Sequence, residues 1–426
     1  MDDTMDDPVD GGDKAVRAQY EAWPYPARDP ADEAHRLITG SPSHILEIEH
    51  FVLRGGRAGD LRALVAGGGT GDGAIMLAQQ LADRGTGSVT YLDMSSASLA
   101  VAQGRARARG LENISFHQGS LLDLPGMGWR PFDYIDCCGV LHHLADPAAG
   151  LAALVAVLAT GGGLGLMLYG ELGRTGVYPA QRAIARLAGD GPAGERLALA
   201  RKLTEALPDG NWLKRNDHVM DHLAGDDAGF YDLLLHSRDR AYLVGEIMTL
   251  MAEAGLRISA FMPAGAYRPE TYLNDGDLIE RAAALSQADR WALAEELSGA
   301  LKTHAFYAVR RADKDHGAAQ GFEPRMVPVL LEMRADRLAA SLSQSPGLNA
   351  TLGGASRRFE VSTQAPAIIA LIDGKRSLRQ IHGRLRARMG KTGAKMSWPD
   401  FQGEFSALFN ILHPLNMLLF AGATLD

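Results

Sequence analysis

Glycines crowd the point where a short apolar run ends. Residues 64–73 read LVAGGGTGDG, the pattern of a strand that runs into glycines opening a helix. A glycine lets a ligand approach the backbone closely and takes turn dihedrals that other residues resist. The unpaired N–H groups at the start of such a helix could bind an anionic group such as a carboxylate. Because Gly69, Gly71 and Ala74 also satisfy the dinucleotide pattern Gly-x-Gly-x-x-Gly/Ala, the loop alone leaves the cofactor open.

Polar residues also close the apolar runs that follow. Asp93 ends TYLD at 90–93, where a carboxylate can accept both ribose hydroxyls of an adenosine cofactor. His142 follows the run at 132–138 and Tyr169 ends the run at 164–169. Both would reach the edge where doubly wound sheets bind ligands, which makes them candidates for acid–base chemistry. A hydrogen-bonded structural histidine is the alternative for His142.

A polar cluster lies within DLLLHSRDRAY at 232–242. We expect this segment to cover the pocket as a lid and to contact the substrate. A surface turn held by salt bridges is the alternative. The residues concerned are Asp232, Arg238 and Tyr242, with His236 as a further catalytic candidate.

Short apolar runs alternate with helical segments over most of the chain. This alternation is typical of βαβ units, and predicts a doubly wound, Rossmann-like α/β domain over 61–312 with helical inserts near 173–240 and 271–301. A helical cap at 14–60 precedes it, and the aspartate-rich residues 1–13 are expected to be disordered. Beyond a linker at 313–320, residues 322–426 predict a smaller, mainly helical domain of winged-helix type. The predicted strands are 62–66, 88–93, 114–118, 132–138, 164–169, 256–262 and 304–310.

These features together resemble the class I S-adenosylmethionine-dependent methyltransferases over about residues 14–311. The segment FHQGSLLDLP at 116–125 matches the family's adenine-contacting loop, and FDYIDCCGVLHHL at 132–144 its fourth strand and pocket loop. The turn TGGG at 160–163 and the two late strands suit the terminal antiparallel pair. The resemblance implies S-adenosyl-L-methionine as the cofactor, no metal, and a small-molecule or peptide/protein methyl acceptor.

The resemblance also assigns roles to individual residues. The glycines of the loop would hold the methionine part of the cofactor, Asp93 the ribose, and Met94 and Leu121 the two faces of the adenine. Ser120 stands where many relatives have an aspartate, and its hydroxyl can still accept a hydrogen bond from the adenine amino group. His143 is interpreted as structural, because VLHHL occurs in relatives with unrelated acceptors. The cofactor-binding set is Gly67, Gly69, Gly71, Asp93, Met94, Ser120, Leu121 and Gly139.

The leader QYEAWPYP at 19–26 resembles that of one bacterial subgroup, which carries Tyr-x-x-x-Pro-Tyr-Pro and a C-terminal accessory domain. In that subgroup aromatic residues fold over the cofactor, so Tyr20, Trp23 and Tyr25 would close the site. A staple that fastens the cap to the core is the alternative.

Charge and composition bound the partners. A net charge of −8 and a pI of about 5.9 disfavour a surface committed to nucleic acid. The stretch 375–395, with eight Lys/Arg and no acidic residue, keeps a tRNA methyltransferase open as an alternative. A non-catalytic adenosine-ligand sensor is the second alternative. Neighbouring Cys137 and Cys138 suit neither a disulfide framework nor a metal site, and no membrane segment is found, so we expect a cytoplasmic protein. The sequence leaves the oligomeric state open, a homodimer included.

Overall fold

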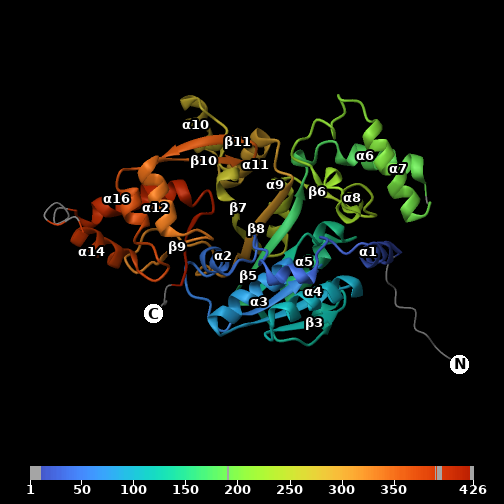
Figure 1. Ribbon diagram of the computed structural model, residues 1–426, viewed down its shortest axis with the longest axis horizontal. Coiled ribbons are helices and arrows are strands. Elements are labelled where there is room, and N and C mark those ends of the chain that lie inside the picture. The colour runs from blue at the N-terminus through green and yellow to red at the C-terminus, as the bar shows by residue number, and fades with distance from the viewer. Residues whose placement is uncertain (1–10, 190, 389, 391–395, 423–426) are drawn as a thin grey trace.

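Eight strands form one sheet at the centre of the molecule (Figure 1). The computed structural model describes residues 11–189, 191–388, 390 and 396–422. Five strands run parallel in the order β3-β2-β1-β4-β5, β8 pairs antiparallel with β5 and β7, and the short β6 pairs with β5 off this path. The predicted doubly wound α/β fold and its late antiparallel pair are confirmed. The strands are β1 (Arg62–Ala66), β2 (Ser88–Asp93), β3 (Ile114–Gln118), β4 (Phe132–Cys138), β5 (Leu158–Gly170), β6 (Ala241–Tyr242), β7 (Leu256–Met262) and β8 (Thr303–Arg310).

Helices cover both faces of this sheet. Alternate side chains of a strand point to opposite faces, so Leu64 of β1 joins one buried cluster while Ala63 and Val65 join another. The first cluster packs against α5 (Pro147–Ala156) and α9 (Val244–Glu253), and the second against α2 (Ile45–Phe51), α3 (Asp72–Arg84) and α4 (Ser96–Arg109).

Strand β5 begins six residues earlier than the sequence predicts. The expected turn at 160–163 lies inside the strand, and the partners of β4 jump from Leu158 to Gly163 between Phe132 and Tyr134. A side chain on Gly163 would lie 2.6 Å from Val52, just beyond α2. The glycines therefore let α2 pack against the sheet, which the local pattern could not reveal.

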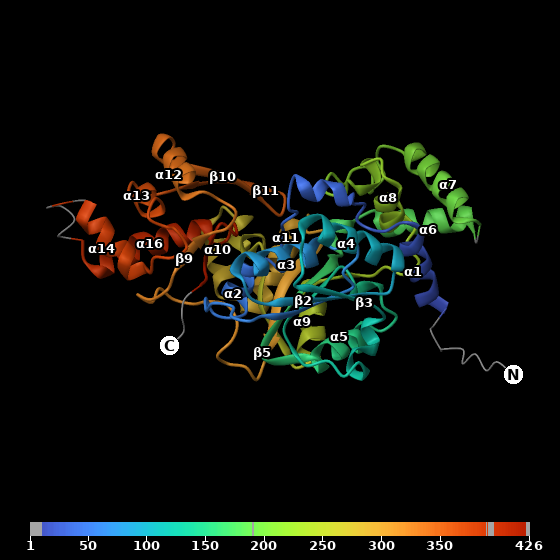
Figure 2. The ribbon, with the colours of Figure 1, turned by 60° about the horizontal axis from the view of Figure 1, so that its bottom comes forward.

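Two helical inserts flank the sheet, as the sequence predicts. The first has a buried core of its own, with Ile184 and Phe230 among its members. We call residues 177–234 the helical lobe; it lies at the same side of the molecule as α1 (Gly11–Ala22) (Figures 1 and 2). Its helices are α6 (Val177–Ala188), α7 (Ala193–Ala206) and α8 (Asp227–Leu234), and the second insert holds α10 (Gly276–Ala283) and α11 (Gln287–Ser298).

The C-terminal module, residues 322–422, combines helices with two pairs of short strands. The mainly helical character is as predicted, whereas the hairpin β10–β11 was not expected. Exposed side chains alternate with half-buried ones along β11, the pattern of a strand with one covered face. The elements are β9 (Pro328–Leu330), α12 (Ala335–Gln344), β10 (Gly347–Leu352), β11 (Ala355–Glu360), α13 (Ala365–Ile369), α14 (Leu378–Arg388), α16 (Trp398–Leu412) and β12 (Leu418–Phe420).

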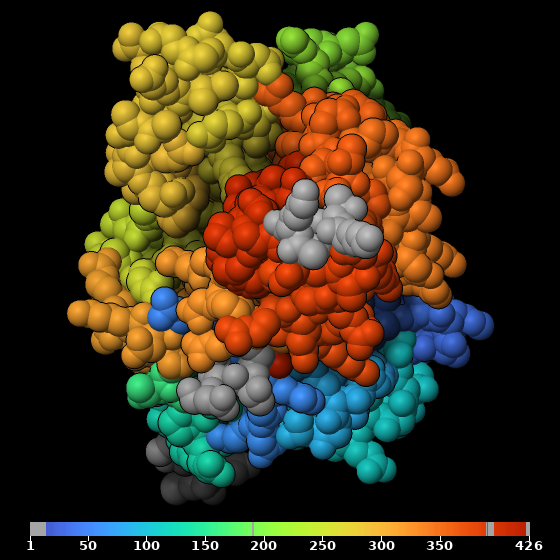
Figure 3. Space-filling model, turned by 90° about the vertical axis from the view of Figure 1, so that its left-hand side faces the viewer, coloured from blue at the N-terminus to red at the C-terminus, as the bar shows by residue number. Residues whose placement is uncertain are grey.

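The predicted linker at 313–320 is docked onto α2. The amide of Gly317 donates to the carbonyl of Val52 at 2.7 Å, and that of Ala319 to the carbonyl of His50 at 2.8 Å. After the linker, Val327, Leu419 and other module residues belong to the same buried cluster as Ala63 and Val65 of β1. Figure 3 shows the orange and red module seated against blue and cyan segments below and yellow segments above. The module therefore has a buried core of its own and also contributes to the core on one face of the sheet.

The chain start is only partly described. Helix α1 begins at Gly11, so the predicted disordered tail is too long by its last three residues, and its residues 1–10 lie outside the described part. The predicted cap contains α1, the short 3-10 helix η1 (Pro30–Ala34) and α2. Within the described residues, no helix has the length and apolar character needed to cross a bilayer.

Candidate functional site

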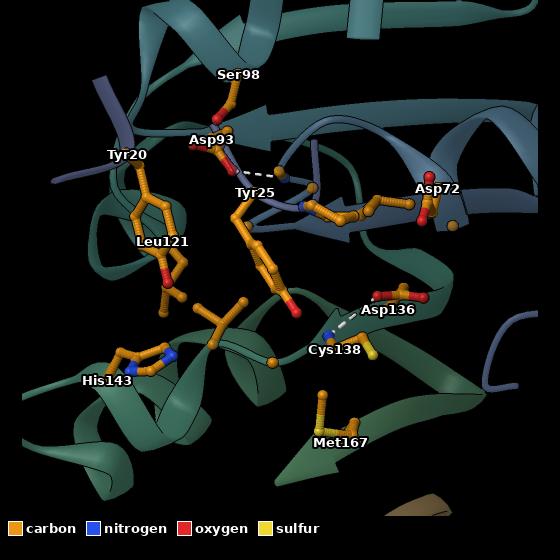
Figure 4. A pocket seen from close by; sticks show the side chains of 18 of the residues that line it. Tyr20, Tyr25, Asp72, Asp93, Ser98, Leu121, Asp136, Cys138, His143 and Met167 are labelled. Atoms are coloured by element: carbon orange, nitrogen blue, oxygen red, sulfur yellow. Dashed lines mark hydrogen bonds between the residues drawn. The ribbon is translucent and has the colours of Figure 1, made fainter. Parts of the chain in front are cut away.

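A cavity of about 400 Å³ opens at the carboxyl ends of β1, β2, β4 and β5 (Figure 4). This is the edge at which open parallel sheets bind ligands, because the loops leaving the strands diverge there. The walls come from the glycine loop, the strand ends, the N-terminal segment and α8.

The glycine loop adopts conformations that only glycine takes easily. Gly67, Gly69 and Gly71 all have positive φ, at 77°, 53° and 102°. A side chain on Gly69 would lie 2.8 Å from the carbonyl oxygen of Tyr25, which crosses above the loop. Gly67 and Gly69 line the cavity, whereas Gly71 is not part of the wall and is the N-cap of α3.

Asp93 stands at the end of β2 beside that loop. Its Oδ2 accepts from the amide of Gly69 at 2.7 Å, and its Oδ1 from the amide of Ser95 at 2.8 Å. Burial raises the pKa of this carboxyl, although the two backbone bonds oppose the change. Each oxygen keeps lone pairs for further donors, as two ribose hydroxyls would require.

The other cofactor positions predicted from the sequence also line the cavity. They are Met94, Ser120, Leu121 and Gly139. Ser120 caps the 3-10 helix η2 (Leu121–Gly126), with its Oγ accepting from the amide of Leu122 at 3.2 Å. An elongated cavity with glycines in the middle and an acid and apolar side chains at one end fits an adenosine cofactor carrying an amino-acid tail.

The N-terminal segment is fastened across the glycine loop. The carboxylate of Glu21 accepts from the amides of Ser96 and Ala97 at 2.7 and 3.0 Å, capping α4. Thr70 Oγ1 donates to the carbonyl of Pro26 at 2.7 Å. A bidentate pair of Arg28 with Asp72 closes the far side. This anchoring places Tyr20 and Tyr25 in the cavity wall.

Trp23 lies outside the wall. Its ring stacks on Tyr231 of α8, with 4.3 Å between the centroids. Trp23 therefore fastens the N-terminal cap to the helical lobe. Of the three aromatic residues expected to close the site, it is the one that instead acts as a staple.

Asp232 of α8 meets two tyrosines at the cavity. Tyr20 donates to its Oδ1 at 3.1 Å and Tyr169 to its Oδ2 at 2.9 Å. The hydroxyl of Tyr20 also lies 3.2 Å from Nε2 of His236. Burial raises the pKa of Asp232. Tyr169 and Asp232 thus reach the cavity as predicted, from segments more than sixty residues apart.

The backbone of Arg238 fixes the protons of two histidines. Its carbonyl can only accept, so His143 Nδ1, at 2.8 Å, carries a proton, and the lone pair of neutral His143 is on Nε2. Its N–H donates to Nδ1 of His236 at 3.0 Å, so neutral His236 carries its proton on Nε2. Arg238 thereby orients the site through its backbone, while its side chain is absent from the cavity wall.

The same hydrogen bonds argue against a metal centre. Ligand atoms of His143, Asp232 and His236 lie within 4.8 Å of one another, a set that transition metals use. A metal needs a lone pair on His236 Nε2, where the bond from Arg238 leaves a proton. The cluster is therefore built for hydrogen bonding rather than for ligation.

The structure places the two adjacent histidines opposite to the prediction. His143 lines the cavity, whereas His142 is buried behind the wall and stacks on Tyr169 with 3.9 Å between ring centroids. Neither nitrogen of His142 has a hydrogen-bond partner among the described residues. The 3-10 turn η3 (Leu141–His143) turns neighbouring side chains to different sides. Tyr242 is also buried away from the wall, with its ring against Arg240.

Two acidic residues of the wall, Asp72 and Asp136, were missed. Asp136 lies inside β4, is 4% exposed and lines the cavity. Burial raises the pKa of this carboxyl to about 6. The available signal was an acidic residue in the middle of the run FDYIDCC, whose other aspartate, Asp133, lies near its start.

Comparison with known proteins agrees with this geometry. A family model described as a methyltransferase domain matches residues 64–164. An uncharacterized protein of Synechococcus sp. is 33% identical over 305 residues, which span 70% of this chain and 72% of that protein. A ubiquinone biosynthesis O-methyltransferase of Stutzerimonas stutzeri is 30% identical over 151 residues, 35% of this chain and 60% of the relative.

Among solved structures, PKMT2 from Rickettsia typhi shares the fold with a TM-score of 0.60 and 14% identity. The match covers 89% of this chain and 75% of that one, and a second structure of the same protein holds AdoHcy. The chain belongs to the class I S-adenosylmethionine-dependent methyltransferases, and S-adenosylmethionine is its cofactor. Within that class it shares a family with the Synechococcus protein. Because it is an enzyme, the sensor alternative is set aside.

Proposed function

We propose that this methyltransferase acts on an amine nitrogen, carried by a small molecule or by a peptide side chain. The observation that carries the proposal is Asp232, a buried carboxylate at the cavity with no Lys or Arg ion pair in the described part of the chain. A buried charge is costly unless it is paired, so this carboxylate favours a cationic ligand.

The cofactor would be held by the glycine loop, Asp93 and the apolar residues near Leu121. When bound, it supplies an electrophilic methyl group, so the protein contributes mainly orientation, desolvation and proton removal. A protonated amine has no lone pair, and a base is therefore needed.

His143 is placed to act as that base. Its Nε2 lone pair would accept a proton from the acceptor ammonium, leaving a neutral amine as the nucleophile. The resulting imidazolium lies within 4.8 Å of the Asp232 carboxylate, which stabilises the transferred charge. Tyr20 and Tyr25 supply aromatic surface for the cation, whereas the faces of Tyr169 are covered by Arg174 and His142.

Electrostatics favours this acceptor over a phenol. His143 could also deprotonate a phenol, but the phenolate formed would lie beside Asp232. Two like charges at about 4 Å repel by roughly 4 kcal/mol in partly buried surroundings. The same carboxylate attracts an ammonium by a similar amount.

An RNA acceptor has less support. The basic residues Arg379, Arg384 and Arg386 lie exposed on or beside α14, at the opposite end of the molecule from α1 and its Tyr20 (Figure 1). The surface as a whole is acidic, with a net charge of −8. RNA bound there would lie far from the cavity.

The test is a methylation assay with matched acceptors. We would measure S-adenosylhomocysteine formation with a lysine-containing peptide, the same peptide carrying tyrosine or serine instead, and small amines and phenols. We expect turnover with amines only, and a loss of roughly 100-fold in kcat/KM for Asp232→Asn. Asp227→Asn, an exposed change on the same helix, should leave turnover intact. Phenol methylation that survives Asp232→Asn would refute the proposal.

A further inference from the structure

The two ends of the cavity differ in character. Asp93 and Leu121 lie on one side in Figure 4, whereas Asp72 and Asp136 lie on the other. The first end suits the adenosine part of the cofactor. The second must receive the amino-acid tail, a zwitterion with a carboxylate and an ammonium on the same carbon.

Asp136 lies directly under the start of α3. Strand β4 pairs with β1 so that Asp136 is opposite Val65, next to the glycine loop. A side chain on Gly73 would lie 3.0 Å from Oδ2 of Asp136. The free N–H groups of the first turn of α3 and this carboxylate therefore border the same end of the cavity.

The charge of Asp136 is not neutralised by any cation in the described residues. Its Oδ2 accepts from the hydroxyl of Ser43, and its Oδ1 from the amide of Cys138 at 3.1 Å. Asp72, the other acid at this end, is paired with Arg28 and Arg105. Asp136 is thus the one acid here that awaits a positive group.

We propose that Asp136 binds the α-ammonium group of the cofactor's methionine part. Ser43 positions the carboxylate, and its own hydroxyl lies 2.9 Å from that of Tyr134. The N–H groups of α3 bind the neighbouring α-carboxylate. Recognition of the tail then needs two opposite charges a few ångströms apart, which the loop and β4 provide together.

This assignment has a consequence for pH. Burial raises the pKa of Asp136 to about 6, and an ammonium beside it favours the ionised form. Affinity for ligands with the amino-acid tail should therefore fall as the pH drops through about 6. The other titratable groups around Asp136 are Asp72 from α3, Glu47 from α2, Tyr134 and Cys138 from β4, and Tyr307 from β8.

The test compares two ligands that differ only in the tail. We would titrate the full-length protein calorimetrically with S-adenosylhomocysteine and with 5′-deoxy-5′-methylthioadenosine, which lacks the amino-acid group. Asp136→Asn should weaken the first by about tenfold or more and leave the second nearly unchanged. Asp133→Asn is the matched control, because Asp133 is on the same strand but accepts from the amide of Arg62 at 2.9 Å.

Equal weakening of both ligands, or unchanged binding of S-adenosylhomocysteine, would overturn the assignment. If Asp136→Asn does not fold, the pH dependence of ligand binding to the wild-type protein tests the same assignment. When the pH is lowered from 7.5 to 5.5, the affinity for S-adenosylhomocysteine should fall about threefold relative to the affinity for 5′-deoxy-5′-methylthioadenosine. A constant ratio would overturn the proposal as well.

Discussion

At the residue scale, His143 and His142 are neighbours with different surroundings. His143 offers Nε2 to the cavity, while His142 is stacked behind Tyr169. We expect His143→Ala to lower kcat by roughly 10²- to 10⁴-fold, the usual range for a lost base, with little change in cofactor affinity. Steady-state kinetics and a cofactor titration would measure both, and added imidazole should restore part of the rate.

The adjacent residue supplies the control. His142→Phe keeps an aromatic ring against Tyr169 and removes two buried nitrogens without partners. This variant should retain most of its activity and unfold at the same or a higher temperature. If instead His142→Phe is inactive and His143→Ala is active, the base is assigned to the wrong histidine.

Asp136 affects stability as well as binding. Its folded pKa is about 6 against an ordinary 3.8, so between these values the folded state keeps a proton that the unfolded chain has lost. Stability therefore falls as the pH rises through this window, and the cost at pH 7 is roughly 3 kcal/mol. Asp136→Asn should stabilise the ligand-free protein at pH 7 by up to this amount and make little difference near pH 4. Urea unfolding across this range measures it, and an equal effect at both pH values would contradict the assignment.

At the scale of elements, α2 joins the sheet to the C-terminal module. Its Glu47 accepts from Tyr307 of β8 at 2.7 Å and also from Asn416 of the module. Its His50 is wholly buried, with Nδ1 accepting from the amide of Phe420 at 2.9 Å. The sequence predicts only a helical cap over residues 14–60. The buried polar residues of α2 find their hydrogen-bond partners only when both the sheet and the C-terminal module pack against it.

The N-cap of α2 predicts a pH effect. His44 accepts from the amide of Leu46 at 3.2 Å, and burial lowers its pKa to about 4. The unfolded chain takes up a proton first as the pH falls from 6.5, so stability is lost in that direction. Between pH 7 and 5 the loss from His44 is roughly 2 kcal/mol. Asparagine is also a good N-cap, so His44→Asn should keep the helix start intact. In this variant the free energy of unfolding should fall by roughly 2 kcal/mol less between pH 7 and 5 than in the wild type. His35→Asn, at an exposed position, should not.

At the scale of the whole molecule, the C-terminal module completes the core of the enzyme. Val327, Val329 and Leu419 are buried in the cluster that includes Val65. Each buried aliphatic side chain contributes about 1.5–3 kcal/mol. A chain ending at Arg311 should therefore melt roughly 10 °C or more below the full chain, or fail to fold.

Calorimetry or a thermal-shift assay measures this difference. The full chain carrying Leu419→Asp tests the same interface without truncation, because it buries a charge in the shared core. Both variants should lose stability together. An unchanged melting temperature for the truncated chain would mean that the module is a separate appendage.

Much of the architecture and cofactor site could be predicted from the sequence. The glycine loop, Asp93 and Leu121 each sit at the end of one βα unit, and local spacing is enough to place such residues at one edge of a parallel sheet. The alternation predicts the strands but not their order, because β1 lies beside β4, about seventy residues later in the chain. The position of such residues at a strand end depends on one βα unit of roughly thirty residues, which a linear pattern records.

Tertiary structure decided the rest. The side on which His143 rather than His142 emerges depends on one 3-10 turn, and Asp232 meets Tyr20 only because α8 folds back over α1. Asp136 became a binding candidate through its register with Val65, and the presumed linker is held against α2 by backbone hydrogen bonds. Each of these outcomes rests on the packing of segments distant in the chain, and a periodic pattern shows which face of a segment is buried but not which distant segment covers it.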